Sequence, residues 1–318
     1  MRILYRSIIL QPQLEALARD AGVTLVEAPD TQTGVREAPH VDALWLWPGC
    51  YDAELAAALG SSQQLRWIQL LTMGYDSLEK FGAPPGITIT NAGDSYAPTV
   101  AEHALALSLA LLRQIRPALE RSTKHAWDSG LSASVATLND ALVAVIGFGS
   151  IGRAIAVRVR ACGARVVAVT RSGRPDPLAD ESAPVGALHA VLARADVVVL
   201  AVPLTAETRG MIDAAALAAL RPGAVLVNIA RGGVIDTAAL VAALREGRLG
   251  GAGLDVTDPE PLPPDHPLWE TPNTIITPHI AGYGGTVPGR RVLGLIGRNL
   301  DAFRNGRALE AQITLTPR

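Results

Sequence analysis

The fold is decided by residues 142–161, which read LVAVIGFGSIGRAIAVRVRA. A continuous apolar strand is expected over 142–146, and a helix-compatible run follows the glycine-rich turn. The turn has the spacing G-x-G-x-x-G in the strand–turn–helix setting that a dinucleotide site needs. Gly147 permits the tight turn, Gly149 lets a pyrophosphate approach the backbone, and Gly152 lets the helix pack close to the strand. This stretch therefore predicts a dinucleotide-binding unit, with phosphates at the helix N-terminus.

The next predicted strand ends at Val169, and Thr170 follows at the place where an NAD site usually carries an acidic residue for the ribose 2′-hydroxyl. Arg171 and Ser172 follow at once, and Arg174 is close behind. Because a neutral residue backed by guanidinium groups attracts a 2′-phosphate, we predict NADP (as NADPH) rather than NAD. NAD stays open, since these arginines would also suit a solvated loop.

Further apolar runs continue the pattern on both sides of the glycine-rich turn. In the C-terminal half they are Arg165–Val169, Val197–Ala201, Ala224–Ile229 and Gly251–Val256. Strands that are apolar on both faces, each followed by a helical segment, indicate a parallel sheet covered by helices on both sides. We therefore expect a Rossmann-type doubly wound parallel sheet.

The first hundred residues alternate strand-like and helix-like segments and predict a smaller α/β domain. Its expected strands are 2–5, 23–27, Ala43–Trp47, Trp67–Leu71 and Ile87–Thr90, and its expected helix is Pro12–Ala21. A long apolar helix is expected from Thr99 to Arg116, because Thr99 and Glu102 fit a capping box. A looser polar stretch follows from Glu120 to Asp140.

The last segments are expected to return to the first domain. A helix is predicted over Gly289–Phe303 and a short strand over 311–315, which is too short to stand alone. The architecture we expect is α/β, with a discontinuous flavodoxin-like substrate domain at 1–98 and 285–318 and a dinucleotide-binding domain at 99–284.

Bulk properties narrow the class of protein. The 318 residues carry a net charge of −2 without a basic stripe, which argues against nucleic acid as a partner. The longest apolar stretches are shorter than the roughly 18 residues of a membrane span or are broken by charge, and the N-terminus lacks a signal-peptide pattern. A cytoplasmic protein is therefore expected. Two distant cysteines and no cluster at metal-ligand spacing predict neither a disulfide framework nor a metal.

Several segments of the C-terminal half resemble the D-2-hydroxyacid dehydrogenases, in that family's order and at its spacing. They are VPLTAETRG (202–210), VNIARGG (227–233), GLDV (253–256), PEPL (259–262) and TPHIAG (277–282). Upstream, VAEH (100–103) and MGYD (73–76) also look like family segments. The resemblance covers most of the chain, is strongest from residue 140 to 282, and is highly specific.

The resemblance implies a catalytic arginine, glutamate and histidine, which fall on Arg231, Glu260 and His279. Reduction of a 2-keto acid needs a cation that holds the carboxylate and polarises the ketone, and the fork of donors on Arg231 fits this role. It also needs a proton donor, and His279 titrates near neutral pH. Glu260 would orient the His279 ring and keep it protonated. For Asp255 the resemblance implies a role in orienting the cofactor or the catalytic residues.

The motifs also give a full set of expected contacts. The expected cofactor contacts are Gly147, Gly149, Ser150, Ile151, Gly152, Thr170, Arg171, Ser172, Val202, Pro203, Thr208, Ile229, Ala230, Arg231, Asp255, His279 and Gly282. The expected substrate contacts are Met73, Gly74, Arg231 and His279. Trp45 and Trp47 would either line a cleft or belong to the core, with the core favoured. His103 is expected to serve the helix that links the domains.

The function expected is hydride transfer between NAD(P)H and C2 of a small 2-keto or 2-hydroxy acid, similar to a glyoxylate/hydroxypyruvate reductase. One alternative is an NAD-linked dehydrogenase of a larger 2-hydroxy acid. Another is a dinucleotide-sensing protein that resembles the transcriptional corepressors of this type. Family members usually form dimers through their cofactor domains, so a homodimer is expected, with the helix from Thr99 to Arg116 contributing.

Overall fold

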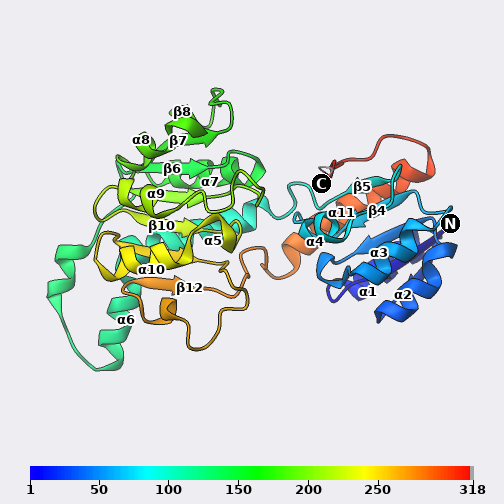
Figure 1. The fold of residues 1–318 in the computed structure, drawn as a ribbon, viewed down its shortest axis with the longest axis horizontal. Coiled ribbons are helices and arrows are strands. Elements are labelled where there is room, and N and C mark those ends of the chain that lie inside the picture. Colours follow the sequence, from blue (N-terminus) through cyan, green and yellow to red (C-terminus); the bar gives the residue numbers. More distant parts are fainter. Residues whose placement is uncertain (316–318) are drawn as a thin grey trace. The chain divides into compact units, whose positions relative to one another are not determined.

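The computed structural model describes residues 1–315, and the chain divides into two compact units (Figure 1). The smaller unit comprises 1–96 and the segment from 284 onward, and the larger comprises Ala97–Tyr283. The expected domain bounds lie a residue or two from these. Residues 316–318, the end of the expected substrate domain, lie outside the described residues.

A seven-stranded sheet forms the centre of the larger unit, and all its neighbouring strands pair in parallel (Figure 1). From one edge to the other its strands are β12 (Thr274–Ile276), β11 (Gly251–Leu254), β10 (Val225–Asn228), β9 (Val197–Leu200), β6 (Leu142–Ile146), β7 (Arg165–Thr170) and β8 (Glu181–Pro184). The order reverses at β6, so this unit has the Rossmann-type arrangement expected from the sequence. The edge strands β8 and β12 were not expected, because each is short and partly polar.

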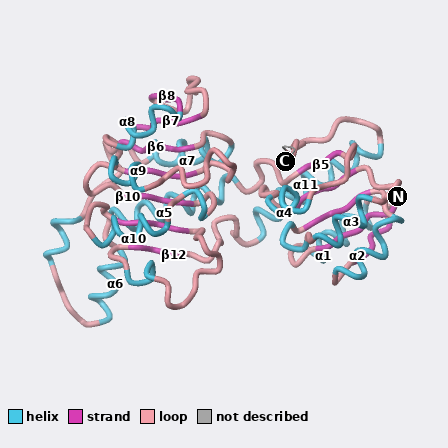
Figure 2. The backbone as a smooth tube through the Cα atoms, viewed as in Figure 1, coloured by secondary structure: helices cyan, strands magenta, loops and turns pink. Residues whose placement is uncertain are grey.

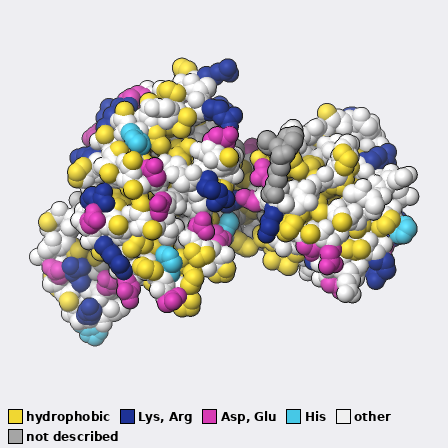
Figure 3. Space-filling view, in the orientation of Figure 1, with side chains coloured by type: hydrophobic (Ala, Val, Ile, Leu, Met, Phe, Trp, Pro, Cys, Tyr) yellow, Lys and Arg dark blue, Asp and Glu magenta, His cyan; other side chains and the backbone are white. Residues whose placement is uncertain are grey.

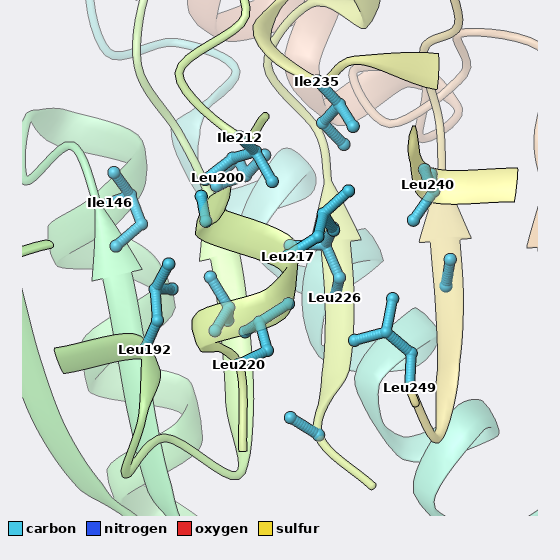
Figure 4. Close-up of a cluster of buried hydrophobic side chains, with 14 of the residues drawn as sticks. Ile146, Leu192, Leu200, Ile212, Leu217, Leu220, Leu226, Ile235, Leu240 and Leu249 are labelled. Carbon is cyan, nitrogen blue, oxygen red and sulfur yellow. The ribbon is translucent and has the colours of Figure 1, made fainter. Parts of the chain in front are cut away.

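Helices cover both faces of this sheet. On one face α5 (Ala97–Leu112) packs against α7 (Ser150–Ala161), and α5 also contacts β10 and β11. On the other face lie α8 (Leu188–Leu192), α9 (Ala214–Ala219) and α10 (Thr237–Arg245). Their leucines interdigitate with strand side chains such as Ile146, Leu200 and Leu226 (Figure 4). Each fully buried leucine contributes about 1.5–3 kcal/mol of burial free energy, which holds the sheet in register.

The region between α5 and β6 differs from the prediction. Helix α5 begins at Ala97, so Thr99 lies inside its first turn and the capping-box prediction is wrong; Glu102 instead lies 3.3 Å from the Arg158 guanidinium. The helix ends at Leu112, because Gln114 adopts the left-handed conformation with φ 54°. A separate helix, α6 (Ile115–Thr123), and a 3₁₀ turn, η3 (Ser129–Ser134), occupy much of the stretch expected to be loose (Figure 2).

The smaller unit contains a five-stranded parallel sheet. Its order is β2 (Thr24–Glu27), β1 (Arg2–Arg6), β3 (Ala43–Leu46), β4 (Trp67–Leu70) and β5 (Thr88–Thr90), which is the flavodoxin-like order. Its helices are α1 (Gln11–Asp20), α2 (Thr31–Glu37), α3 (Ala53–Gly60), α4 (Asp76–Phe81) and α11 (Thr286–Arg304). Helices α2, α3 and α4 were not expected. Asp30 and Asp52 cap α2 and α3 by accepting the amides of Thr33 and Leu55, a signal present in the sequence.

The segment after α11 is held to the sheet by a buried polar network rather than by a strand. The strand expected at 311–315 is wrong, because only one isolated bridge joins Gln312 to Thr90. Asn299 of α11 donates to Gln69 Oε1 at 2.9 Å and accepts the Glu310 amide at 2.7 Å. Thr90 Oγ1 of β5 also donates to Gln69 Oε1, at 2.9 Å. Asn299, Gln69 and Thr90 are all fully buried, so these bonds join the returning segment to β4 and β5.

No helix within residues 1–315 is both long and apolar enough to cross a membrane.

Replacing Asn299 with Leu should lower the free energy of unfolding by about 2–3 kcal/mol, because the Glu310 amide loses its acceptor and the buried Gln69 side chain loses a donor. Urea titration followed by tryptophan fluorescence measures this change. The matched control is Asn305→Leu, since Asn305 is exposed and its side-chain amide donates to the backbone and side-chain oxygens of Asp301. Equal losses in the two variants would contradict the role given to Asn299.

Candidate active site

Three of the expected site residues follow three neighbouring strands. Arg231 lies after β10, Asp255 directly after β11 and His279 after β12. These strands are adjacent and parallel, so their carboxyl ends meet at one edge of the sheet. The glycine-rich turn follows β6 at that same edge, which is where proteins of this fold bind ligands.

Asp255 is the buried charge of this edge, with a side chain only 1% exposed. Its Oδ1 accepts hydrogen bonds from Thr277 Oγ1 at 2.6 Å and from the Ile280 amide at 2.9 Å, and its Oδ2 accepts the Ala281 amide at 2.9 Å. Burial raises the pKa of Asp255, but the hydrogen bonds from His103, Thr277 and the two amides outweigh it and hold that pKa below its usual value. Asp255 is therefore a carboxylate at neutral pH.

His279 is held in an unusual backbone conformation by the same residue. Its φ is +53°, in the left-handed region that few residues other than glycine adopt. The His279 amide donates to the Asp255 carbonyl at 2.8 Å, while the Asp255 carboxylate binds the next two amides. Asp255 thus fixes the loop on which His279 is presented.

Glu260 and His279 form a close pair, as expected from their motifs. The distance from Glu260 Oε1 to His279 Nδ1 is 2.6 Å. This hydrogen bond raises the pKa of His279, while burial and the Arg231 charge act in the opposite direction without cancelling it. The pairing directs the Nδ1 proton toward Glu260, which leaves Nε2 as the nitrogen that can exchange a proton with a ligand.

Arg231 is placed by two residues that the sequence reasoning missed. The side chain of Asn228, fully buried at the end of β10, accepts the Ala230 amide at 3.0 Å and donates to the Arg231 carbonyl at 2.9 Å. At Gly232 a Cβ atom would lie 2.0 Å from the Thr257 carbonyl oxygen, so the Arg231 loop packs directly on the loop that leads to Glu260. An asparagine that ends an apolar strand was the available signal.

The glycine-rich turn has the geometry of a phosphate cradle. A Cβ at Gly147 would lie 2.6 Å from the Ala201 carbonyl oxygen, and one at Gly152 would lie 2.2 Å from the Gly147 carbonyl oxygen. Both glycines are therefore required by the fold. No atom lies within 4 Å of a Cβ built at Gly149, so the space in front of α7 is open, and Ser150 and Ile151 begin that helix. These residues fit a dinucleotide pyrophosphate.

The other expected cofactor contacts lie along the carboxyl edge of the same sheet. Thr170 ends β7, and its hydroxyl accepts the Gly173 amide at 2.9 Å, which shapes the turn that exposes Arg171 and Ser172. After β9, Thr208 Oγ1 donates to the Pro203 carbonyl at 2.6 Å in the loop that begins with Val202. Ile229 and Ala230 are buried behind Arg231, and Gly282 lies three residues past His279.

The expected substrate loop belongs to the smaller unit. Met73 and Gly74 follow β4, and side chains hold their carbonyl groups: Asn91 donates to Met73 at 2.9 Å and Thr72 to Gly74 at 3.1 Å. Trp45 is fully buried in this unit's core, as favoured from the sequence, whereas Trp47 is half-buried just beyond β3. Among the described residues, no group of three or more His, Cys, Asp or Glu side chains is arranged to hold a metal ion.

Comparison with known proteins agrees with this geometry. Residues 105–281 match the family model described as D-isomer specific 2-hydroxyacid dehydrogenase, NAD binding domain. The chain is 36% identical to a glyoxylate reductase of Pyrococcus furiosus over 77% of this chain and 75% of that protein. A crystal structure of an NADPH-dependent glyoxylate/hydroxypyruvate reductase from Sinorhizobium meliloti, in complex with NADP and sulfate, superposes with a TM-score of 0.85 at 26% identity, covering 98% of both chains.

A further similarity concerns longer proteins. The chain is 36% identical to a D-3-phosphoglycerate dehydrogenase of Mycobacterium leprae over 280 residues, which is 87% of this chain and 52% of that protein. The chain therefore spans about half the length of this relative.

Replacing Gly149 with Ala should leave the free energy of unfolding within about 1 kcal/mol of the parent, because a Cβ there meets open space. It should raise the Kd for NADPH at least about tenfold, because the methyl group occupies the approach to the helix amides. Nucleotide fluorescence titration measures the Kd.

The matched control is Gly60→Ala, since Gly60 also faces open space but is the last residue of α3, in the smaller unit. An unchanged NADPH affinity in the Gly149 variant would contradict the binding of the cofactor phosphates at the glycine-rich turn.

Proposed function

Because the chain belongs to the D-isomer specific 2-hydroxyacid dehydrogenase family, we propose that it reduces a small 2-keto acid with NADPH, with glyoxylate and hydroxypyruvate as the favoured substrates. The observation that carries the proposal is the Glu260–His279 pair, whose charge state is also influenced by Arg231. The pair stands at the sheet edge that carries the dinucleotide turn. The similarity to a glyoxylate reductase and to an NADPH-dependent reductase supports the choice of substrate and cofactor.

The proposed chemistry divides among three side chains. A reduced nicotinamide, when bound, supplies the hydride that reaches C2 of the keto acid. The Arg231 guanidinium holds the substrate carboxylate and polarises the ketone oxygen. As the C2 oxygen becomes an alkoxide, protonated His279 gives it the Nε2 proton, so that the product carries a neutral hydroxyl group at C2. Glu260 stabilises the imidazolium before transfer, and in the oxidation direction neutral His279 accepts the hydroxyl proton.

Residues at the end of β7 would set the preference between NADPH and NADH. Thr170 replaces the usual acidic residue, and Arg171 is exposed beside it. Hydrogen bonds from the Thr205 side chain and the backbone lower the pKa of Glu207, and the charge of Arg171 adds to this. The positive charge of Arg171 beside a neutral Thr170 favours the 2′-phosphate of NADPH. The Val202, Pro203 and Thr208 loop would line the cofactor's course between this turn and the nicotinamide.

Two alternatives remain distinguishable by experiment. The similarity to a D-3-phosphoglycerate dehydrogenase favours a second candidate, an NAD-linked enzyme for a larger 2-hydroxy acid, so that acid belongs in a substrate panel. A dinucleotide sensor would bind the cofactor tightly without turnover.

A cytoplasmic location and a homodimer stay predictions. Figure 3 shows charged side chains of both signs interspersed over the drawn face. Much of α5 is buried against α7 and the sheet, while Leu119 and Trp127, farther along the chain, are 61% and 99% exposed. We propose that a dimer would form through the larger unit and that the α6–η3 region would take part.

The proposal is tested by following the absorbance of NADPH and of NADH separately with glyoxylate, hydroxypyruvate, pyruvate and phenylpyruvate, and with 3-phosphoglycerate in the oxidation direction. We expect fast NADPH oxidation with glyoxylate or hydroxypyruvate, and a loss of about 10²–10⁴ in kcat in His279→Ala. Preference for NADH would contradict the role of Thr170 and Arg171 but not the mechanism. Tight cofactor binding without turnover of any acid would overturn the proposed function.

The pH profile of kcat/KM should report the raised pKa of His279. Reduction needs the protonated ring, so its rate should fall as pH rises through that pKa, while the rate of oxidation should rise through it. In Glu260→Gln the pKa of His279 loses its main support, so the fall in reduction should begin roughly one pH unit or more lower.

The control for this profile is Glu246→Gln, which removes an exposed carboxylate beside Arg248 at the end of α10. A profile that does not move in Glu260→Gln would contradict the pairing.

A further inference from the structure

His103 joins α5 to the loop that presents His279. His103 Nε2 lies 2.9 Å from Thr277 Oγ1 and 3.4 Å from Asp255 Oδ1, and Thr277 Oγ1 donates to Asp255 Oδ1 at 2.6 Å. We propose that His103 is a positioning residue that holds the Asp255–Thr277 pair, and through it the His279 loop, in the arrangement that the chemistry needs. This inference rests on the proposed function for the identity of the reaction.

The direction of each hydrogen bond follows from the ionisation of Asp255. A carboxylate can only accept, so the single hydroxyl proton of Thr277 points to Asp255. Thr277 Oγ1 is then an acceptor toward His103, and Nε2 of His103 must carry a hydrogen. His103 therefore donates a hydrogen bond to Thr277, and Thr277 donates one to Asp255. A residue at position 103 supports this arrangement only if it places a donor where Nε2 lies.

These hydrogen bonds lead to the backbone that directly follows His279. The two oxygens of Asp255 accept the amides of Ile280 and Ala281, the two residues after His279. His279 itself is kept at φ +53°, a conformation that persists in a residue with a side chain only where the surroundings impose it. Rotation of the Asp255 carboxylate would release both amides, so any group that fixes its rotation also fixes His279.

Helix α5 comes close enough for this contact because β11 contains a glycine. Leu107, one turn after His103, has its Cβ 3.0 Å from the position that a Cβ would take at Gly253. A larger residue at Gly253 would push α5 away from the strand that ends just before Asp255. Gly253 thus allows α5 to approach β11, and His103 of α5 then reaches Thr277 and Asp255.

A space-filling role for His103 makes a different prediction. His103 has a side chain 21% exposed, so its shape alone is not tightly confined. If it only filled space, leucine would replace it as well as glutamine. If it positions Asp255 and Thr277, glutamine should preserve function, because its side-chain amide can place an N–H near the site of Nε2, and leucine should not.

The test compares His103→Gln, His103→Leu and a control, His189→Leu, in which an exposed histidine of α8 is replaced. Glyoxylate or hydroxypyruvate reduction gives kcat and KM, and selective ¹⁵N labelling gives the backbone amide signals of Ile280 and Ala281. We expect His103→Leu to lose about ten- to a hundredfold in kcat with KM for NADPH unchanged, and to shift both amide signals. His103→Gln and the control should resemble the parent.

If His103→Leu does not fold, Thr277→Val and Thr277→Ser repeat the comparison. The serine variant should keep the Ile280 and Ala281 amide signals at their parent positions, and the valine variant should shift them. Equal behaviour of leucine and glutamine at position 103, or parent-like amide signals in both His103→Leu and Thr277→Val, would overturn the inference. If the parent protein reduces no keto acid, the proposed function fails, whereas the amide signals still decide whether His103 holds the loop.

Discussion

The arrangement of the site depends on one buried charge, the carboxylate of Asp255. Taking a carboxylate out of water costs several kcal/mol unless hydrogen bonds replace the lost solvation. Here the hydroxyl of Thr277 and the amides of Ile280 and Ala281 replace it, with His103 beside them. The same bonds that make the charge tolerable join the ends of β11 and β12 to α5. Solvation of the Asp255 side chain and orientation of His279 are therefore a single requirement.

The rest of the site follows from parallel strands and from residues small enough to let loops meet. Adjacent strand ends bring Arg231, Asp255 and His279 to one edge, and the chain reaches Glu260 five residues after Asp255. Gly232 lets the Arg231 loop contact the backbone at Thr257, and Gly147 lets the dinucleotide turn contact the backbone at Ala201. A side chain at either glycine would separate the loops by more than the site allows. Both loops thus depend on backbone contact for their position.

The sequence predicts the parts of the molecule that local patterns encode. Strand, turn and helix around Gly147–Gly152, the two parallel sheets and the Glu260–His279 pair were all expected. The missed features depend on contacts distant in sequence: His103 meets Asp255 across 152 positions, and Asn299 meets Gln69 across 230. The misplaced end of α5 has a local cause, because apolar spacing continues past Leu112 and the left-handed Gln114 ends the helix. The short edge strand β8 has too few apolar residues to give a pattern.

This site is proposed to move a hydride to C2 of a small keto acid. The most direct test traces the hydride itself, with NADPH that carries deuterium at both C4 positions of the nicotinamide ring and hydroxypyruvate as acceptor. We predict one deuterium at C2 of the product, a single enantiomer of the D configuration, and none in the solvent. A product whose C2 hydrogen comes from water, or deuterium released to the solvent, would contradict the proposed hydride transfer.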